Sequence, residues 1–246
     1  MITSASNPRL KLVRRLESRR QRERLGLFVC EGEDLVAAAL DAGLEPVEAL
    51  VDGERPALLE RLPRHELVAP ALLAEVASLA HPPRLIALFR TADLPLGPLP
   101  PVGLALWCVR DPGNVGTLVR AADALGPAFL ALSRGSADPL GSKATRAAMG
   151  ALFRVPLVGF EEAPRPRVAL VPAGGRTLAD LDLAAGVTFV LGSERAGLPE
   201  HVVSACEERA SIPLAAHAES LNVAMAGTIA LYERARATQT LSSPPA

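Results

Sequence analysis

Cysteine and histidine are both scarce in this sequence of 246 residues, which contains three of the first and four of the second. Cys30, Cys108 and Cys206 are odd in number, far apart and never spaced as C-x-x-C. They predict buried free thiols and argue against a disulfide framework. The histidines also lack the spacing of metal ligands. We therefore expect no metal site.

Long apolar runs are missing as well. No uninterrupted stretch approaches the roughly 20 residues that a membrane-spanning helix needs, and the N-terminus carries charges where a signal peptide would have an apolar core. These absences predict a soluble, cytoplasmic protein without a membrane partner. Hydrophobic residues nevertheless make up 49% of the chain, which is ample for buried cores, and the length suggests two modest domains.

The common nucleotide-binding and hydrolase motifs are absent too. No G-x-G-x-x-G follows an apolar strand, and neither Lys11 nor Lys143 stands in a Walker A context, which argues against dinucleotide-binding and P-loop enzymes. There is no H-E-x-x-H and no nucleophile elbow, so the sequence also argues against zinc proteases and hydrolases of the nucleophile-elbow type.

The chain as a whole has no large excess of positive or negative charge, since its formal net charge is −1. Any affinity for nucleic acid must therefore come from a local surplus. Residues 9–24 provide one, and their candidate phosphate-binding residues are Arg9, Arg14, Arg15, Arg19 and Arg20. Such a segment fits either an RNA-binding helix or a solvated helix face.

Residues 1–92 predict a small N-terminal α/β domain. Asn7 followed by Pro8 fits the N-cap and first position of a basic helix. Further apolar and amphipathic stretches predict strands at residues 27–29, 47–51, 66–68 and 85–89, and helices at 35–40, 57–62 and 71–79. Prolines and glycines in residues 93–103 then predict an extended linker.

Residues 104–238 predict a second α/β domain. Apolar runs at residues 104–109, 128–132, 155–158, 168–171 and 188–191 alternate with helical stretches, which indicates a parallel sheet covered by helices. A short strand near Ile212 and a final amphipathic helix over residues 221–236 complete the pattern. The Ser/Pro-rich residues 239–246 predict a disordered tail.

Three polar segments follow expected strands of this domain, at the edge where parallel sheets place their ligands. Taken singly, each fits an ordinary turn or helix cap. The first contains Asn114 and Arg120, the second Gly192 and Glu194, and the third Ser220 and Asn222.

Together and in this order, the three segments resemble the SpoU branch of the SPOUT methyltransferases. They are similar to the family motifs N-x-G-x-x-x-R, G-x-E-x-x-G-L and I-P followed by S-L-N-V, and they cover about residues 111–233. The basic helix and small α/β domain ahead of them resemble the substrate domain of members that act on ribosomal RNA. The resemblance implies transfer of a methyl group from S-adenosylmethionine to a ribose 2′-hydroxyl of RNA.

The resemblance also implies a site and a topology. The C-terminal domain would contain a deep trefoil knot, which no sequence pattern would suggest, and would form a homodimer that completes the site. The implied cofactor-binding residues are Leu191, Gly192, Ile212, Leu214 and Leu221. The implied catalytic residues are Arg120, Asn114, Glu194, Ser220 and Asn222, with Glu194 as the partner for the charge of Arg120.

Two positions depart from the family pattern. Arg195 stands where many members have glycine in the second motif, and Ala216 replaces a glycine of the third. Both positions line the cofactor pocket in the family. Arg195 therefore either reshapes the pocket or contacts RNA, and the Cβ of Ala216 restricts the third loop.

The reaction is an in-line displacement that must align two atoms and manage one proton. If Arg120 were a literal base, a neutral guanidine at neutral pH would cost on the order of 8 kcal/mol. We therefore favour a charged Arg120 that holds phosphate and stabilises developing negative charge. Ribosomal RNA is the expected substrate, and a transfer-RNA methyltransferase or a noncatalytic ribosome-assembly factor are the alternatives. A resistance enzyme of identical chemistry also stays open.

Overall fold

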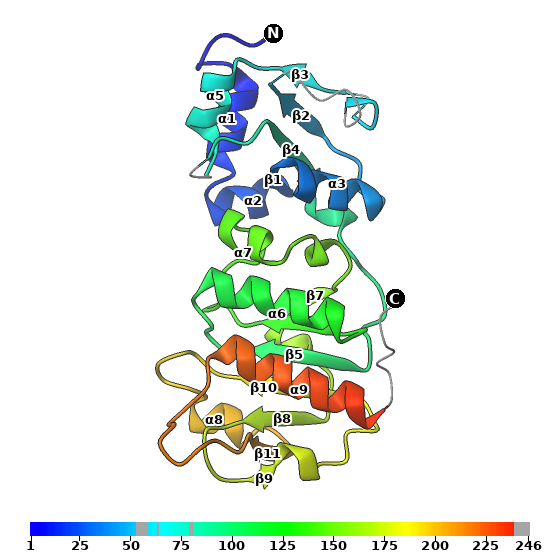
Figure 1. The fold of residues 1–246 in the computed structure, drawn as a ribbon, viewed down its shortest axis with the longest axis vertical. Coiled ribbons are helices and arrows are strands. Elements are labelled where there is room, and N and C mark those ends of the chain that lie inside the picture. Colours follow the sequence, from blue (N-terminus) through cyan, green and yellow to red (C-terminus); the bar gives the residue numbers. More distant parts are fainter. Residues whose placement is uncertain (53–58, 63, 79–80, 239–246) are drawn as a thin grey trace. The chain divides into compact units, whose positions relative to one another are not determined.

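The computed structural model describes residues 1–52, 59–62, 64–78 and 81–238, and the chain forms two compact units. The first unit contains Met1–Leu96 and Asp138–Arg154, and the second contains Gly97–Ala137 and Val155–Ala246. The sequence pattern had placed residues 138–154 wholly within the C-terminal domain. Figure 1 follows the elements of each unit along the chain.

The first unit is built on a four-stranded mixed sheet with the order β1-β4-β2-β3. β4 pairs antiparallel with both β1 and β2, whereas β2 and β3 are parallel. The strands are β1 Leu27–Glu31, β2 Glu48–Val51, β3 Glu66–Leu67 and β4 Leu85–Arg90. The helices described in sequence order are α1 Pro8–Arg15, α2 Arg19–Leu25, α3 Glu33–Asp41 and α5 Pro70–Val76.

The basic N-terminal segment is two helices, although the sequence predicts one. Asn7 caps α1 as expected, because its side chain accepts a hydrogen bond from the Arg9 backbone N–H at 2.9 Å. The break lies between Arg15 and Arg19, where the guanidinium of Arg22 donates to the carbonyls of Leu16 and Glu17. Carbonyls at a helix end need such partners, so Arg22 ends α1 and lets the chain turn into α2.

Two other predicted helices of this unit differ from the sequence pattern. The helix over residues 71–79 is α5, which ends at Val76 because Ala77 is extended. The helix over residues 57–62 begins outside the described residues, and residues 60–62 are not helical.

Residues 138–154 are attached to the first unit by a buried ion pair and an aromatic contact. Arg22 donates to Asp138, with 2.5 Å between the guanidinium nitrogen and the carboxylate oxygen, and the two side chains are only 8% and 16% exposed. Phe153 packs against Phe28 of β1 with ring centroids 6.3 Å apart. Between them, the helix α7 (Ser142–Ala147) packs on β1.

The second unit has a seven-stranded sheet in which every described strand pair is parallel. Its order is β7-β6-β5-β10-β8-β11-β9, which confirms the predicted parallel α/β domain. The strands are β5 Val102–Leu106, β6 Phe129–Leu132, β7 Leu157–Gly159, β8 Arg167–Leu170, β9 Arg176–Thr177, β10 Val187–Leu191 and β11 Glu208–Ser211. The sequence pattern missed β9, and it placed the last strand near Ile212, just beyond the actual end of β11.

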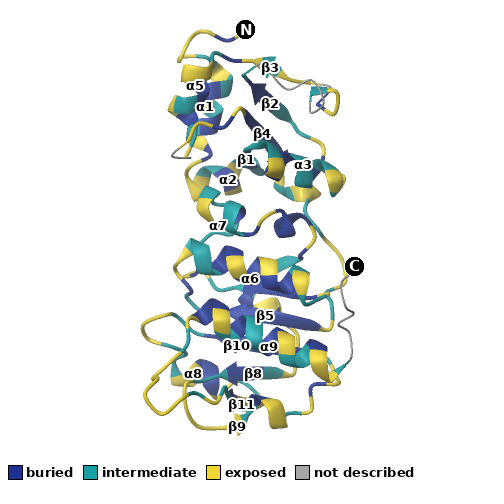
Figure 2. Ribbon diagram, in the orientation of Figure 1, coloured by how far each residue is buried: buried dark blue, intermediate teal, exposed yellow. Residues whose placement is uncertain are grey.

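Helices cover both faces of this sheet, and its central strands are buried (Figure 2). On one face lie α6 (Pro112–Ala124) and α9 (Val223–Ala237), which pack against each other. A Cβ on Gly227 of α9 would lie 2.5 Å from Leu118 of α6, so glycine permits this close approach. The opposite face packs on the short helices η3 (Phe160–Glu162) and α8 (Glu200–Val203).

We expect Asp138→Ala to destabilise the first unit by about 3–5 kcal/mol, because it leaves the buried guanidinium of Arg22 without its counter-ion. Asp41→Ala is the matched control, since Asp41 pairs with Arg61 at a site where the side chains are 68% and 42% exposed. That change should cost less than about 1 kcal/mol. Urea unfolding measures both, and equal losses would contradict a special role for the Arg22–Asp138 pair.

Candidate active site at the carboxyl edge of the parallel sheet

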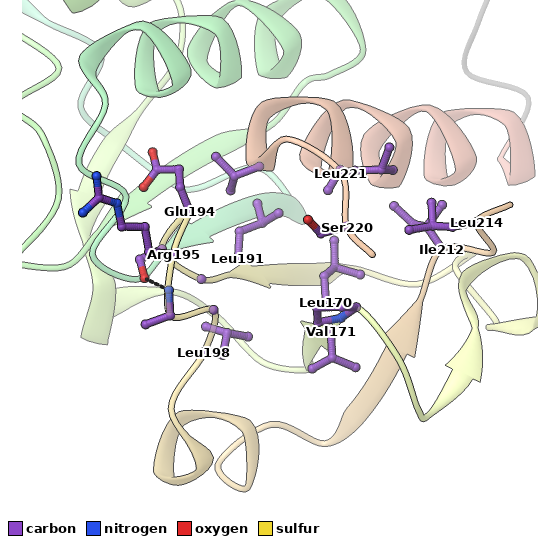
Figure 3. A pocket seen from close by; sticks show the side chains of 17 residues that line it. Leu170, Val171, Leu191, Glu194, Arg195, Leu198, Ile212, Leu214, Ser220 and Leu221 are labelled. Carbon is purple, nitrogen blue, oxygen red and sulfur yellow. Dashed lines mark hydrogen bonds between the residues drawn. The ribbon is translucent and has the colours of Figure 1, made fainter. Parts of the chain in front are cut away.

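A cavity of about 380 Å³ opens where β8, β10 and β11 end. Segments that follow all three strands line it, together with the start of α9 (Figure 3). Parallel α/β sheets place ligands at this edge because the loops after the strands converge there. The lining residues are Leu170, Val171, Pro172, residues 191–198, Ile212, Leu214, Ser220, Leu221, Val223 and Ala226.

The five residues predicted to bind a cofactor all line this cavity. Leu191 is buried at the end of β10, and Ile212 and Leu214 lie at the end of the cavity farthest from Arg195 (Figure 3). The sequence did not single out Leu170 and Val171, although they follow β8 and therefore occupy the same edge.

The loop after β10 is a tight turn that only glycine permits at two positions. Ser193 and Gly197 exchange backbone hydrogen bonds of 3.1 and 2.9 Å, and Gly197 has a φ of +63°. A Cβ on Gly192 would lie 2.1 Å from the carbonyl carbon of Gly197. The loop can therefore fold back on itself at the cavity wall, which Glu194, Arg195 and Leu198 line (Figure 3).

A chain of side-chain hydrogen bonds joins the three predicted motifs. The Oδ1 atom of Asn222 caps α9 by accepting from the Ala224 backbone N–H at 2.8 Å. Its Nδ2 atom must then face outward, and it donates to Oδ1 of Asn114 at 3.1 Å. Asn114 in turn donates from Nδ2 to Oε1 of Glu194 at 3.0 Å. The helix cap thus fixes the orientation of both amides and leaves Glu194 as the acceptor.

Glu194 is held as a carboxylate. Partial burial opposes its ionisation, but hydrogen bonds from Asn114 and from the backbone N–H groups of Asp111 and Arg110 outweigh that effect and lower the pKa of Glu194. A carboxylate with a lowered pKa is a good orienting acceptor and a weak base.

Arg120 lies apart from this network. It is exposed on α6, does not line the cavity, and forms no ion pair among the described residues, so the expected pairing with Glu194 is not present there. Six residues after Asn114, its side chain lies about 9 Å further along the helix and on another face. Ser220, by contrast, lines the cavity.

The two positions that depart from the family pattern differ in their surroundings. Arg195 lines the cavity, and Figure 3 shows its guanidinium beside Glu194 and directed away from the apolar end. Ala216 is exposed in the loop before α9 and is not among the lining residues.

The N-terminal arginines are less available than the sequence suggested. Arg9 pairs with Glu48 at 2.8 Å and with Glu66 at 3.0 Å. Arg14 and Arg19 also form ion pairs, with Glu75 and Glu23. Within the described part of the chain, Arg15 and Arg20 form no ion pair.

The described residues contain no cluster of three or more potential metal ligands. The same residues include no helix that is long and apolar enough to cross a membrane.

Comparisons with known proteins find a matching family for each of the two units. The SpoU rRNA Methylase family matches residues 101–232, and the MRM3-like substrate binding domain matches residues 7–87. The 23S rRNA (guanosine(2553)-2′-O)-methyltransferase RlmP of Bacillus subtilis is 29% identical, with 94% of this chain and 97% of the relative covered. The 23S rRNA (uridine(2479)-2′-O)-methyltransferase of Streptomyces viridochromogenes is 31% identical, with 90% and 86% covered.

A solved structure is similar over both units. The AdoMet-bound crystal structure of an rRNA methyltransferase from Sinorhizobium meliloti superposes with a TM-score of 0.84 at 31% identity, covering 98% of each chain. The fold and the edge cavity define an α/β protein with a parallel-sheet ligand site. The chain belongs to the SpoU rRNA Methylase family.

We expect Glu194→Gln to remove a pH-dependent part of the stability. Because folding lowers the pKa of Glu194, its stabilising contribution is complete above the unfolded-state value of about 4.3 and disappears as the pH falls through the lower folded-state value. The wild-type advantage in unfolding free energy should therefore shrink on acidification below pH of about 5. Urea unfolding at several pH values measures it, with Glu219→Gln as a control, and a constant difference would refute the expectation.

Proposed function

We propose that this protein transfers a methyl group from S-adenosylmethionine to a ribose 2′-hydroxyl of ribosomal RNA of the 23S class, in the cytoplasm. The observation that carries the proposal is the bonded chain Asn222–Asn114–Glu194, which joins all three family motifs and ends at Glu194 in the wall of the edge cavity. Relatives named as 23S rRNA 2′-O-methyltransferases support the substrate class.

The cavity fits S-adenosylmethionine. Its volume is in the range of small-molecule sites, roughly 300–1,000 Å³, and its apolar wall of Leu170, Leu191, Ile212, Leu214 and Leu221 suits the adenosine portion. The backbone of residues 192–198 offers polar groups, and the Glu194 carboxylate favours a positive charge nearby. When bound, the cofactor supplies an electrophilic methyl group on a sulfonium.

The protein's own residues have to position the ribose and offset the charge that develops on its oxygen. Glu194 is a rigidly oriented acceptor and Asn114 a rigidly oriented amide for this purpose, and Ser220 adds a hydroxyl from the cavity wall. Arg120 remains charged, holds the target phosphate and stabilises the developing alkoxide, while the proton leaves by another route.

The position of Arg120 leads us to propose a homodimer in which it acts on the partner's cavity. Arg120 does not line the cavity of its own chain. On α9, which packs beside α6, Met225 and Tyr232 are 60% and 46% exposed. They are seven residues apart and so share one helix face. Exposed apolar side chains on a helix that packs against the helix of Arg120 suit a subunit interface.

The matched families support roles for both units. We propose that the first unit binds RNA, in line with its match to a substrate binding domain. We also expect the segments around residues 192–199 and 212–221, which both line the cavity, to be part of a trefoil knot, as the family resemblance implies.

Methyl transfer is the direct test. Tritium from labelled S-adenosylmethionine should enter unmodified 23S ribosomal RNA and reappear in nuclease-resistant dinucleotides, the signature of a 2′-O-methyl group. Arg120→Ala should lower the rate at least about 100-fold, since one electrostatic stabiliser of a transition state contributes that much. Label in transfer RNA alone would show that the substrate is transfer RNA and not ribosomal RNA. No label in either RNA, with S-adenosylmethionine still bound, would favour the noncatalytic assembly factor.

Complementation between two inactive variants tests the composite site. Gly192→Ala should lose cofactor binding, because its Cβ would lie 2.1 Å from a backbone carbon of the loop. Arg120→Ala should retain it. A heterodimer of the two variants should recover up to half of the wild-type activity, since one cavity then has an intact loop and an arginine from the other chain. An inactive heterodimer would show that Arg120 acts within its own chain.

A further inference from the structure

Three exposed arginines follow three neighbouring strands of the second unit. Arg134 comes after β6, Arg110 after β5 and Arg195 after β10. These strands lie side by side in the order β6-β5-β10 and are parallel. All three arginines are therefore at the same carboxyl edge as the cavity, which Arg195 lines.

The side chains of these three arginines form no ion pair and no hydrogen bond with any described residue. Other arginines of the same unit behave differently. Arg165, Arg176 and Arg209 pair respectively with Glu207, Glu208 and Glu200. An exposed cation without a carboxylate partner keeps its full attraction for a polyanion, whereas a paired one has to give up its partner first.

An aromatic ring accompanies the three cations. Trp107, the only tryptophan of the chain, directly follows β5 and is partly exposed. Its backbone N–H donates to the carbonyl of Leu191, a cavity residue, at 2.8 Å. Its indole contacts Phe160 and His201 edge-on, with ring centroids 5.1 and 5.5 Å apart. The ring is thus fixed in direction: it packs against the core cluster that contains Phe160 and remains partly exposed.

Glu194 and Asp111, which adjoin Arg195 and Arg110 in the sequence, already accept hydrogen bonds from other groups. Glu194 accepts from Asn114 and from two backbone N–H groups. Asp111 accepts from the Asn114 backbone N–H at 3.0 Å and caps α6. Among the described residues, Glu194 forms no ion pair with Arg110, Arg134 or Arg195.

We propose that this edge is a track for single-stranded RNA next to the methylated nucleotide. Arg134, Arg110 and Arg195 bind successive phosphates, and Trp107 stacks on an unpaired base. The combination of cations along the backbone with an aromatic side chain for bases is the usual recognition of single-stranded nucleic acid. This assignment rests on the proposed RNA substrate, and it places sequence-independent affinity in the catalytic unit as well as in the first unit.

The salt dependence of RNA binding tests the three arginines. In the variant with Arg110, Arg134 and Arg195 each changed to Gln, the slope of log K against log salt for unmodified 23S ribosomal RNA should fall by about 2, from roughly 0.7 per lost contact with a single strand. The control changes Arg165, Arg176 and Arg209 to Gln. It removes the same charge from the same unit and should leave the slope within about 0.5 of wild type. Equal slopes for the two triple variants would overturn the proposal.

Fluorescence of the single tryptophan tests the stacking contact. Unmodified 23S ribosomal RNA should quench Trp107 and shield it from acrylamide, whereas polyphosphate, which has charge but no bases, should do neither. Quenching by S-adenosylhomocysteine alone to the same extent would place the indole in the cofactor site and overturn the assignment. Free N-acetyltryptophanamide corrects for absorption by the RNA.

Kinetics of Trp107 variants separate stacking from stability. Trp107→Leu should raise KM for RNA about 5-fold or more, because stacking of one base contributes roughly 1–3 kcal/mol, while kcat and cofactor affinity change little. Trp107→Phe should restore most of the loss. Wild-type methylation with unchanged KM in Trp107→Leu would refute the RNA track alone. A wild-type protein that binds RNA in this way but transfers no methyl group would refute the proposed function instead.

Discussion

The amide of Asn222 is the constraint on which the rest of the site depends. Its oxygen is committed to the first backbone N–H groups of α9, so its nitrogen has to point outward and donate. That requirement fixes the amide of Asn114, and Asn114 then fixes Glu194 as an acceptor. An ordinary helix cap therefore orients the hydrogen bonds of a site whose members come from three separate segments: the start of α6, the loop after β10 and the start of α9.

Two glycines play a comparable part in the loop after β10. Gly192 and Gly197 let the backbone fold tightly enough that this polar loop and the apolar side chains that follow β8 and β11 line one cavity. A small amphipathic ligand needs both kinds of surface. The charged groups, Glu194 and Arg195, lie at one end of the cavity, away from Ile212 and Leu214 (Figure 3).

Charge pairing distinguishes the two arginine-rich regions of the protein. The N-terminal helices have more arginines than the sheet edge. However, Arg9, Arg14 and Arg19 each have a carboxylate partner, and Arg22 forms a buried ion pair with Asp138. The arginines at the sheet edge are fewer and free of such partners among the described residues. Counting basic residues along a sequence therefore overstates the first region and misses the second.

Much of the candidate site could be predicted from sequence, because its determinants are local or belong to motifs. The apolar strands of the parallel sheet and the Asn7–Pro8 helix start lie where their patterns indicated. The five residues that the family resemblance implied around the cofactor line one cavity. β9 and the exact place of β11 could not be predicted, since β9 is a two-residue edge strand and its neighbour β11 reads Glu-Arg-Ala-Ser, which has no apolar run. Edge strands bury too little side chain to leave a hydrophobic signature.

The sequence by itself determined the α/β class, the three motifs and the glycines that the cavity loop requires, because each depends on residue type and short spacing. Only the tertiary structure decided which charges are paired. The break between α1 and α2 depends on Arg22 and Asp138, which are 116 residues apart. The bond from Asn222 to Asn114 spans 108 residues. Ion pairs and hydrogen bonds form between groups that are close in space, and the separation of two residues along the chain does not predict that distance.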